Sequence, residues 1–541
     1  MYTPESPMDM IPGTIFEDWR TYQRETVEWI AEEFLKGRKY VAIDGPTGYG
    51  KSLTGVMAGK VLKARTLYLC HSKQLQDQIA ADFSDHCAVL KGKSNYPCLQ
   101  CPGVAADLCS HDSKTPCKYA GKRDRDYNWV RLPQCPYKVA KIEALRAPLL
   151  VANYALFLNE ANYVGGLSDW PLLVIDEADM TDNALTGHLT LDINTKDLET
   201  YKLDPPDFPD ELESWTFWVP GAILAVDEVF QLYMAEINEA TMLGVSPSTS
   251  SQKSAKRAKT FLGKLKTFSY WVDSQWIMDA DEYKGTWSFK PKWADRIANS
   301  LMMRHSPRIL AMSGTMPIPE LWGPDLGISA KDIGFQAIPS TFPVANRPFI
   351  ARQDGPSMYY KTKEAERLVQ YGQALALVDN LMERYPTDKG VVHTISKEIS
   401  KFVVNNSSNA HRLVTHDTAT RGQVAQDFID SPDPLVMVSP SFGRGLDLKD
   451  DRGRFQAIMK IPYAGLGDKQ TKARADDGER GSLWYSGLAA REIVQMTGRV
   501  TRSDTDWGRT YMVDKRFMSF YAKNRRHFPK YFQEAVTAMD Q

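Results

Sequence analysis

Residues 45–52 read Gly45-Pro46-Thr47-Gly48-Tyr49-Gly50-Lys51-Ser52. The apolar run of residues 40–43 precedes this stretch and helix formers follow it as far as Lys63, so the expected order is strand, glycine-rich loop, helix. Glycines let backbone N–H groups close around phosphate oxygens, and the helix presents its N-terminus to the same anion. The spacing fits GxxxxGK[ST], in which Lys51 reaches the β- and γ-phosphates of ATP and Ser52 binds Mg²⁺. An ordinary glycine turn is the alternative interpretation.

A second buried strand, residues 172–175, ends in Asp176-Glu177-Ala178-Asp179. A strand end points its carboxylates at one place. Asp176 is therefore expected to hold Mg²⁺ through water, and Glu177 to polarise the water that attacks the γ-phosphate. The alternative is a solvated strand end. Because a phosphate loop precedes them, these residues predict ATP hydrolysis.

The C-terminal half contains Gln495-Met496-Thr497-Gly498-Arg499-Val500-Thr501-Arg502. Its two arginines, three positions apart, are expected on one helical face behind Gln495. Arginines that act on transition-state charge contribute on the order of 10³–10⁵ in rate. Arg499 and Arg502 would therefore join Gln495 in catalysis from the far side of a cleft. A basic helix face without a catalytic role is the alternative.

Further apolar runs in this half indicate a second parallel sheet. They cover residues 390–394, 435–439 and 457–461, and helical stretches such as Gly372 to Tyr385 separate them. Strands that alternate with helices are typical of parallel α/β layers. By contrast, residues 185–299 lack strand-like alternation and are rich in helix formers, which predicts a helical segment.

Length and composition limit the class of protein. A chain of 541 residues is too long for one hydrophobic core, so two large domains with insertions are expected. The hydrophobic fraction of 43% is typical of a globular protein, and the net charge of −1 restricts any nucleic-acid contact to a local groove. Apolar runs stay well short of the roughly 18 residues that cross a bilayer, and the N-terminus does not resemble a signal peptide. We expect no membrane contact and a cytoplasmic location.

The cysteines are placed unevenly. Five of the seven lie between positions 98 and 135. In a reducing compartment, such a cluster suggests a metal site more than disulfides. The spacing of Cys98 and Cys101 could also begin a tetrahedral zinc site.

In chain order, the motifs resemble those of superfamily two helicases. The series comprises Arg20 to Gln23, the loop at 45–52, the box at 176–179, and residues 313–315, 443–447 and 495–502. Residues 90–98, 135–137 and 151–154 resemble the XPD/DinG branch in particular. Asp179 is a departure, because this branch more often has histidine there.

The resemblance implies an α/β fold with two RecA-like parallel-sheet motor domains, the first of which carries an iron–sulfur insertion and a helical arch-like insertion. Motor domain 1 would comprise residues 1–90, 141–184 and 300–340. The iron–sulfur insertion would cover residues 91–140, the arch-like insertion 185–299, and motor domain 2 residues 341–541.

The resemblance also implies roles for single residues. Gln23 would read the adenine edge with support from Arg20, and Ser313 and Thr315 would couple the nucleotide state to DNA. The residues implied on the second domain's side of the cleft are Arg444, Gly445 and Asp447.

For the cysteine insertion, the resemblance implies a [4Fe–4S] cluster, with zinc as the lesser alternative. Cys98 and Cys135 carry the flanking signatures, Cys109 and Cys117 are the expected middle ligands, and Cys101 is a rival for one position. Basic and aromatic side chains surround this insertion, and a second basic run follows at residues 253–266. Such surfaces suit single-stranded DNA, although a solvated helix face looks similar.

The implied function is an ATP-dependent DNA helicase that moves 5′ to 3′ on single-stranded DNA and opens forked duplexes. It would act as a monomer in repair or replication, with protein partners that the sequence does not name. The compact form resembles versions carried by bacteria or their phages. The rival function is that of an ATP-gated protein that binds or remodels single-stranded DNA without separating strands.

Overall fold

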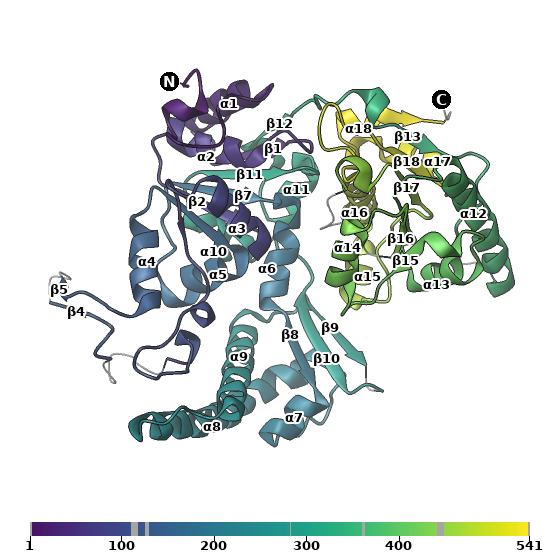
Figure 1. The fold of residues 1–541 in the computed structure, drawn as a ribbon. Helices are drawn as coiled ribbons and strands as arrows, with labels where there is room; N and C mark the ends of the chain where they lie inside the picture. Colours follow the sequence, from purple (N-terminus) through teal and green to yellow (C-terminus); the bar gives the residue numbers. More distant parts are fainter. Residues whose placement is uncertain are drawn as a thin grey trace.

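The computed structural model describes residues 3–109, 117–124, 129–281, 283–359, 363–440 and 448–538. Two α/β domains lie side by side, each built on a parallel sheet, and a third part extends from the first domain (Figure 1). This arrangement confirms the predicted α/β class with two parallel sheets. In the described ranges, every helix is too short or too polar to cross a bilayer.

The first sheet has seven parallel strands in the order β12-β1-β11-β7-β2-β6-β3. In chain order these strands are β1 (Tyr40–Asp44), β2 (Thr66–Cys70), β3 (Ala88–Val89), β6 (Leu149–Asn153), β7 (Leu172–Asp176), β11 (Ile309–Ser313) and β12 (Ile333–Ala337). The glycine-rich loop follows β1 and the acidic box follows β7, with only β11 between them. Because the strands are parallel, both motifs lie at the same edge of the sheet.

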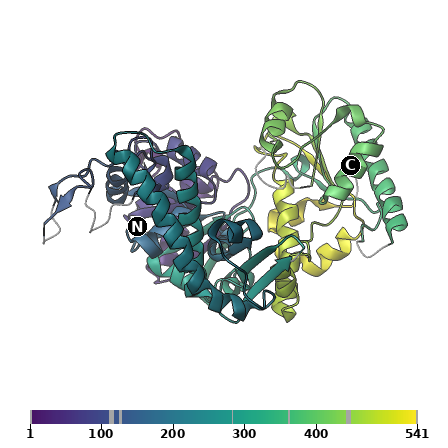
Figure 2. The same cartoon turned by 90° about the horizontal axis from the view of Figure 1, so that it is seen from below.

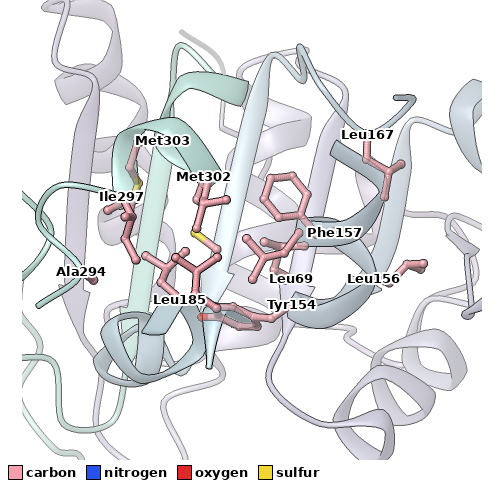
Figure 3. Packing of buried hydrophobic residues seen from close by; sticks show 14 of the residues in the cluster. Leu69, Tyr154, Leu156, Phe157, Leu167, Leu185, Ala294, Ile297, Met302 and Met303 are labelled. Atoms are coloured by element: carbon pink, nitrogen blue, oxygen red, sulfur yellow. The ribbon is translucent and has the colours of Figure 1, made fainter. Parts of the chain in front are cut away.

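Helices cover both faces of this sheet, which explains why its strands are apolar runs without alternation. One face packs against α1 (Gln23–Leu35), α2 (Lys51–Val61) and α3 (Lys73–Asp82). The other face packs against α5 (Tyr154–Asn159) and α6 (Thr181–Leu189). Figure 3 shows this second face, where Leu69 of β2 lies near Phe157 and Leu185.

The second sheet also has seven parallel strands, in the order β15-β16-β14-β17-β18-β13-β19. They are β13 (Phe349–Ala351), β14 (Gly390–His393), β15 (Leu413–Thr415), β16 (Val436–Ser439), β17 (Phe455–Ile458), β18 (Arg509–Met512) and β19 (Val536–Thr537). The surrounding helices are α12 (Glu364–Arg384), α13 (Lys397–Asn406), α14 (Arg421–Asp430), α16 (Gly478–Thr497), α17 (Phe517–Asn524) and α18 (Lys530–Ala535). The three apolar runs recognised in the sequence form β14, β16 and β17, which confirms the second sheet.

The third part is built on two long helices, α8 (Leu212–Met242) and α9 (Thr249–Trp271), which pack against each other (Figure 2). These helices confirm the predicted helical insertion, but the region also contains strands, which the lack of alternation did not predict. A three-stranded antiparallel sheet joins the helices to the first domain, with the order β8 (Leu191–Asn194), β10 (Thr286–Pro291) and β9 (Trp276–Asp281). Trp287 and Phe289 of β10 pack on Trp215 of α8, with ring centroids 5.2 and 5.4 Å apart. Short strands such as these form because side chains distant in sequence pack against them. An alternating pattern of polar and apolar residues does not reveal such packing.

The described cysteine segment consists of short elements. They are η2 (Lys93–Asn95), η3 (Ala106–Leu108), the hairpin β4 (Lys122–Arg123) and β5 (Trp129–Arg131), and α4 (Pro136–Arg146). This segment contacts the long helices, because Asp107 pairs with Lys256 of α9 at 3.0 Å and Leu108 packs against Met234 and Ile237 of α8. The two insertions of the first domain therefore support each other.

A buried ion pair joins the second domain to the base of the third part. Arg474 of α15 (Lys469–Ala475) is 2% exposed and pairs with Asp182 of α6 at 2.7 Å. Its guanidinium also lies over the rings of Trp293 and Trp484, at 4.9 and 5.3 Å from their centroids. Cation–π contacts of this kind contribute most where water is excluded.

Replacing Arg474 with alanine should destabilise the protein by about 3–5 kcal/mol, because Asp182 would stay buried without its cation. Urea unfolding followed by circular dichroism measures the shift. The matched control is Lys284→Ala, which removes an exposed pair with Asp281 and should leave the transition unchanged. Equal shifts in the two variants would show that the buried pair does not hold the domains together.

Candidate nucleotide-binding site

The glycine-rich loop leaves the end of β1 and enters α2 at Lys51. Gly48 and Gly50 have φ angles of +81° and +90°, which side-chain-bearing residues rarely adopt. A Cβ would lie 2.2 Å from the Phe342 ring at Gly48, and 2.2 Å from the Gln23 amide at Gly50. Gly50 also offers no capping side chain to the first N–H groups of α2. Those groups therefore remain available to a phosphate.

The residues predicted to bind Mg²⁺ converge on one hydroxyl. Tyr68 of β2 donates a hydrogen bond to Asp176 Oδ2 at 2.9 Å. Burial raises the pKa of Tyr68, and Ser52 lies close enough to the same hydroxyl to offset part of that rise. Burial raises the pKa of Asp176, whereas the Lys51 ammonium and the Tyr68 hydroxyl lower it. Lys51, Ser52 and Asp176 therefore surround one point beside the loop. Their roles as phosphate and metal ligands stay predictions.

The rest of the acidic box links to the neighbouring strand. Glu177 has a φ angle of +49°, a left-handed conformation that collects at functional sites when a residue is not glycine. Its N–H donates to Asp176 Oδ1 at 2.9 Å. Asp179 accepts hydrogen bonds from Ser313 Oγ at 2.7 Å and Thr315 Oγ1 at 3.3 Å. The Asp179 carboxylate thus holds one hydroxyl at the end of β11 and another just after it.

The second domain meets this edge through the end of α16. Gln495 Nε2 donates to Thr315 Oγ1 at 2.7 Å. A Cβ at Gly498 would lie 2.9 Å from Thr47 Oγ1 of the glycine-rich loop. A continuous hydrogen-bond path therefore runs from Asp179 through Thr315 to Gln495, across the boundary between the two sheets.

The prediction that Arg499 and Arg502 share a helical face is wrong. Helix α16 ends at Thr497, and glycine at the following position commonly stops a helix. Val500 then turns into a small core with Phe428 of α14. Both arginines therefore lie on the irregular segment after the helix.

The surroundings of these arginines differ. Arg499 lies near His393 at the end of β14, and burial together with the charge of Arg499 lowers the pKa of that histidine to about 4. The backbone N–H of Arg502 donates to Asp506 at 2.9 Å. The remaining predicted residues of this domain lie outside the described part of the chain: Arg444, Gly445 and Asp447.

Gln23 and Arg20 hold the glycine-rich loop by its carbonyl groups. Gln23 Nε2 donates to Tyr49 O at 2.9 Å and to Gly50 O at 3.1 Å. Arg20 Nη1 donates to Gly48 O at 2.6 Å, and its backbone N–H donates to Gln23 Oε1 at 2.7 Å. Both residues are therefore placed beside the loop, and adenine recognition stays a prediction.

Four cysteines line one cavity of about 130 Å³ in the cysteine segment: Cys98, Cys109, Cys117 and Cys135. Cys101 is instead buried against Val104 and Leu108, beside the long helices. Burial raises the pKa of the Cys98 thiol. Among the described residues, no three His, Cys, Asp or Glu side chains are grouped closely enough to hold a metal ion.

Sequence reasoning missed three residues of the interdomain edge. Tyr68 appears only as part of an apolar strand, and Tyr531 lies in α18, far from any motif. Tyr531 donates a hydrogen bond to Gly314 O at 2.9 Å from the second domain. Asp44 is 4% exposed, and burial raises its pKa to about 8. In the sequence, Asp44 could have been identified by its position, because it is a carboxylate at the end of a buried strand.

These features lie where two RecA-like domains meet. Two family models match the chain: the Type III restriction enzyme, res subunit, over residues 17–179, and the helicase C-terminal domain over residues 380–535. A Methanocaldococcus jannaschii protein named as a probable ATP-dependent helicase is 20% identical, over 91% of this chain and 91% of its own.

Solved structures show the same fold. An XPD helicase has a TM-score of 0.61 and 17% identity, over 96% of this chain and 99% of that chain. Xpd4 of S. tokodaii has a TM-score of 0.57 and 14% identity, over 96% of this chain and 100% of that chain. Over nearly its whole length the chain is similar to XPD/DinG-like helicases of superfamily two.

The substitution Asp44→Asn should stabilise the protein near neutral pH. Between about pH 4 and 8, Asp44 stays protonated in the folded protein but ionises in the unfolded chain. Each rise of one pH unit in this range therefore lowers the free energy of unfolding by at most about 1.4 kcal/mol. The stability of the wild type should therefore fall through this window relative to the variant. Urea unfolding at several pH values should give similar midpoints near pH 4 and a growing advantage for the variant toward pH 8. A constant difference would contradict the raised pKa.

Proposed function

We propose that this chain is an ATP-dependent DNA helicase that moves 5′ to 3′ along single-stranded DNA. The observation that carries the proposal is the hydrogen-bond path Asp179–Thr315–Gln495, which joins the acidic box of one domain to α16 of the other. The M. jannaschii relative, which matches nearly the whole chain, is named as a probable ATP-dependent helicase. DNA as the track and the 5′-to-3′ direction rest on the family.

In the proposed reaction, ATP binds with its phosphates on the loop at residues 45–52. Mg²⁺ held by Ser52 and Asp176 would neutralise charge on the β- and γ-phosphates. Glu177 orients a water molecule and accepts a proton from it. The oxygen of this water bonds to the γ-phosphorus. The bond from that phosphorus to the bridging oxygen breaks, and ADP leaves with the electron pair. Gln495, Arg499 and Arg502 approach from the second domain to stabilise the transition state.

Hydrolysis is coupled to movement by the contact between Gln495 and Thr315. Their 2.7 Å hydrogen bond is lost if the cleft opens by more than about an ångström, because such bonds weaken steeply with distance and angle. Closure in the ATP state and opening after hydrolysis therefore make and break this contact. A strand bound across both domains would advance with each cycle.

The basic run on α9 gives little support to the DNA contact predicted there. Lys256 pairs with Asp107, and Arg257 pairs with Asp197 at 2.7 Å. Lys264 donates to the backbone carbonyl of His188 at 2.8 Å. These cations bind within the protein, so their placement favours a structural role in holding α9 to its neighbours.

We also propose a [4Fe–4S] cluster in the cysteine segment. Each thiolate of such a cluster binds a different iron, so its four ligands must line a cavity rather than meet at one ion. The cavity of about 130 Å³ lined by Cys98, Cys109, Cys117 and Cys135 fits this requirement. Cys135 also stands directly before the first residue of α4, so a cluster would connect that helix to the loops on the opposite side of the cavity.

Strand displacement tests the helicase proposal. The wild type should separate a duplex with a 5′ single-stranded tail in the presence of ATP, and should fail with a 3′ tail. Lys51→Ala should abolish both ATP hydrolysis and unwinding, because the γ-phosphate loses its cation. Lys63→Ala, just beyond the other end of α2, is the matched control and should retain both activities. DNA-stimulated hydrolysis without strand displacement would favour the remodelling protein instead.

Iron and zinc counts on anaerobically purified protein test the cluster. The wild type should contain about four irons per chain and absorb visible light. Cys109→Ser should lose most of the iron, because it removes a thiolate from the cavity. Cys101→Ser should keep the iron, because that thiol packs outside the cavity. Zinc in place of iron, or iron loss in both variants, would refute this ligand set.

A further inference from the structure

A second cavity lies between the two domains, beside the nucleotide site. Its volume is about 200 Å³. The first domain contributes Asp44, residues 315–318 and the end of β12 to its wall. The second domain contributes α16, the segment that precedes α18, and the start of α18. The motifs used for the proposed hydrolysis do not account for this cavity.

The second domain's wall is basic. Arg491, Arg526 and Lys530 line the cavity, and within the described ranges none of them has a carboxylate within ion-pair distance. Among the described residues of the wall, Asp44 is the only acidic side chain, against three basic ones, and burial raises its pKa to about 8. The cavity therefore has a net positive lining.

His527 contributes buried polar atoms to the cavity wall. Both of its ring nitrogens are buried, and neither has a hydrogen-bond partner among the described residues. Burial, together with Arg526 and Arg491, lowers the pKa of His527 to about 4, so the neutral ring still carries one N–H donor near pH 7. Buried polar atoms without partners are rare, and an ion or water usually satisfies them.

The cavity begins where the γ-phosphate is expected. Asp44 immediately precedes the glycine-rich loop, and Thr315 follows Gly314 directly. A Cβ at Gly314 would lie 3.6 Å from Lys51 Nζ. At the other end, Arg526 and Lys530 are exposed. The cavity therefore extends from Thr315, whose neighbour Gly314 lies beside Lys51, toward solvent along a basic wall.

We propose that this cavity binds the inorganic phosphate released by hydrolysis and forms its exit from the cleft. The inference rests on the ATP hydrolysis proposed above. Hydrolysis leaves ADP on the loop at residues 45–52 and frees a phosphate ion. Thr315 lies on one side of this phosphate, and Arg526 and Lys530 lie on the other. While it is bound, this anion bridges the two domains and holds the cleft closed. Its departure permits the Gln495–Thr315 contact to open.

The same basic wall could take a phosphate of the nucleic-acid backbone. Both sources offer a tetrahedral oxyanion, but only released phosphate must pass Lys51 and Thr315. The cavity is placed for that passage, because Thr315 lines it and Gly314, the residue before Thr315, lies next to Lys51.

Titration of inorganic phosphate into the full-length, ADP-bound protein tests the proposal without any need for turnover. The double variant Arg526→Ala/Lys530→Ala should bind phosphate about tenfold more weakly than the wild type, since it loses two cations. Lys523→Ala in α17 removes an exposed lysine outside the cavity and should bind phosphate as the wild type does. Inhibition of ATP hydrolysis by added phosphate should weaken by a similar factor in the double variant only.

Two results would overturn the proposal. One is equal or undetectable phosphate binding in the wild type and the double variant. The other is a loss of single-stranded DNA affinity in the double variant while phosphate binding is unchanged, which would assign the wall to the nucleic-acid backbone. Neither result touches the proposed function, which fails only if the wild type does not hydrolyse ATP or does not separate strands.

Discussion

The structure depends on a chain of hydrogen bonds that crosses the boundary between two parallel sheets. Thr315 donates to Asp179 within the first domain and accepts from Gln495 of the second. Ser313, Thr315 and Asp179 are all buried, where water cannot compete for their hydrogen bonds. A change in the angle between the domains must therefore break this path or rebuild it. In the proposed function, the state of a nucleotide beside Asp176 and Glu177 would control that angle.

Contacts with the two insertions connect the position of the second domain to the rest of the molecule. Arg474 fixes the second domain to α6 and Trp293, at the base of the long helices. Asp107 in turn fixes the cysteine segment to α9. Movement of the second domain is therefore passed through buried and partly buried contacts to both insertions. The cavity below α16 adds a site where a product anion could control when that movement occurs.

The sequence predicted the features that chemistry dictates locally. The glycines at 48 and 50 are required by positive φ angles and close contacts, so the loop could be recognised without a structure. The remaining features depend on residues distant in sequence. Strand β10 is stabilised by Trp215, α16 ends before the arginines that were expected on it, and the cysteine cavity separates Cys101 from the expected ligands. Tyr531 meets Gly314 only after folding, because 217 positions separate them.

Hydrogen exchange tests most directly whether ATP is bound between the two sheets. The wild type would be compared with and without a non-hydrolysable ATP analogue and Mg²⁺, and exchange followed in peptides that cover residues 45–52 and 495–502. Slower exchange in both peptides is the predicted result, because the analogue should order the loop of one domain and the end of α16 in the other. Protection of the loop alone, with residues 495–502 unchanged, would contradict a site shared by the two domains.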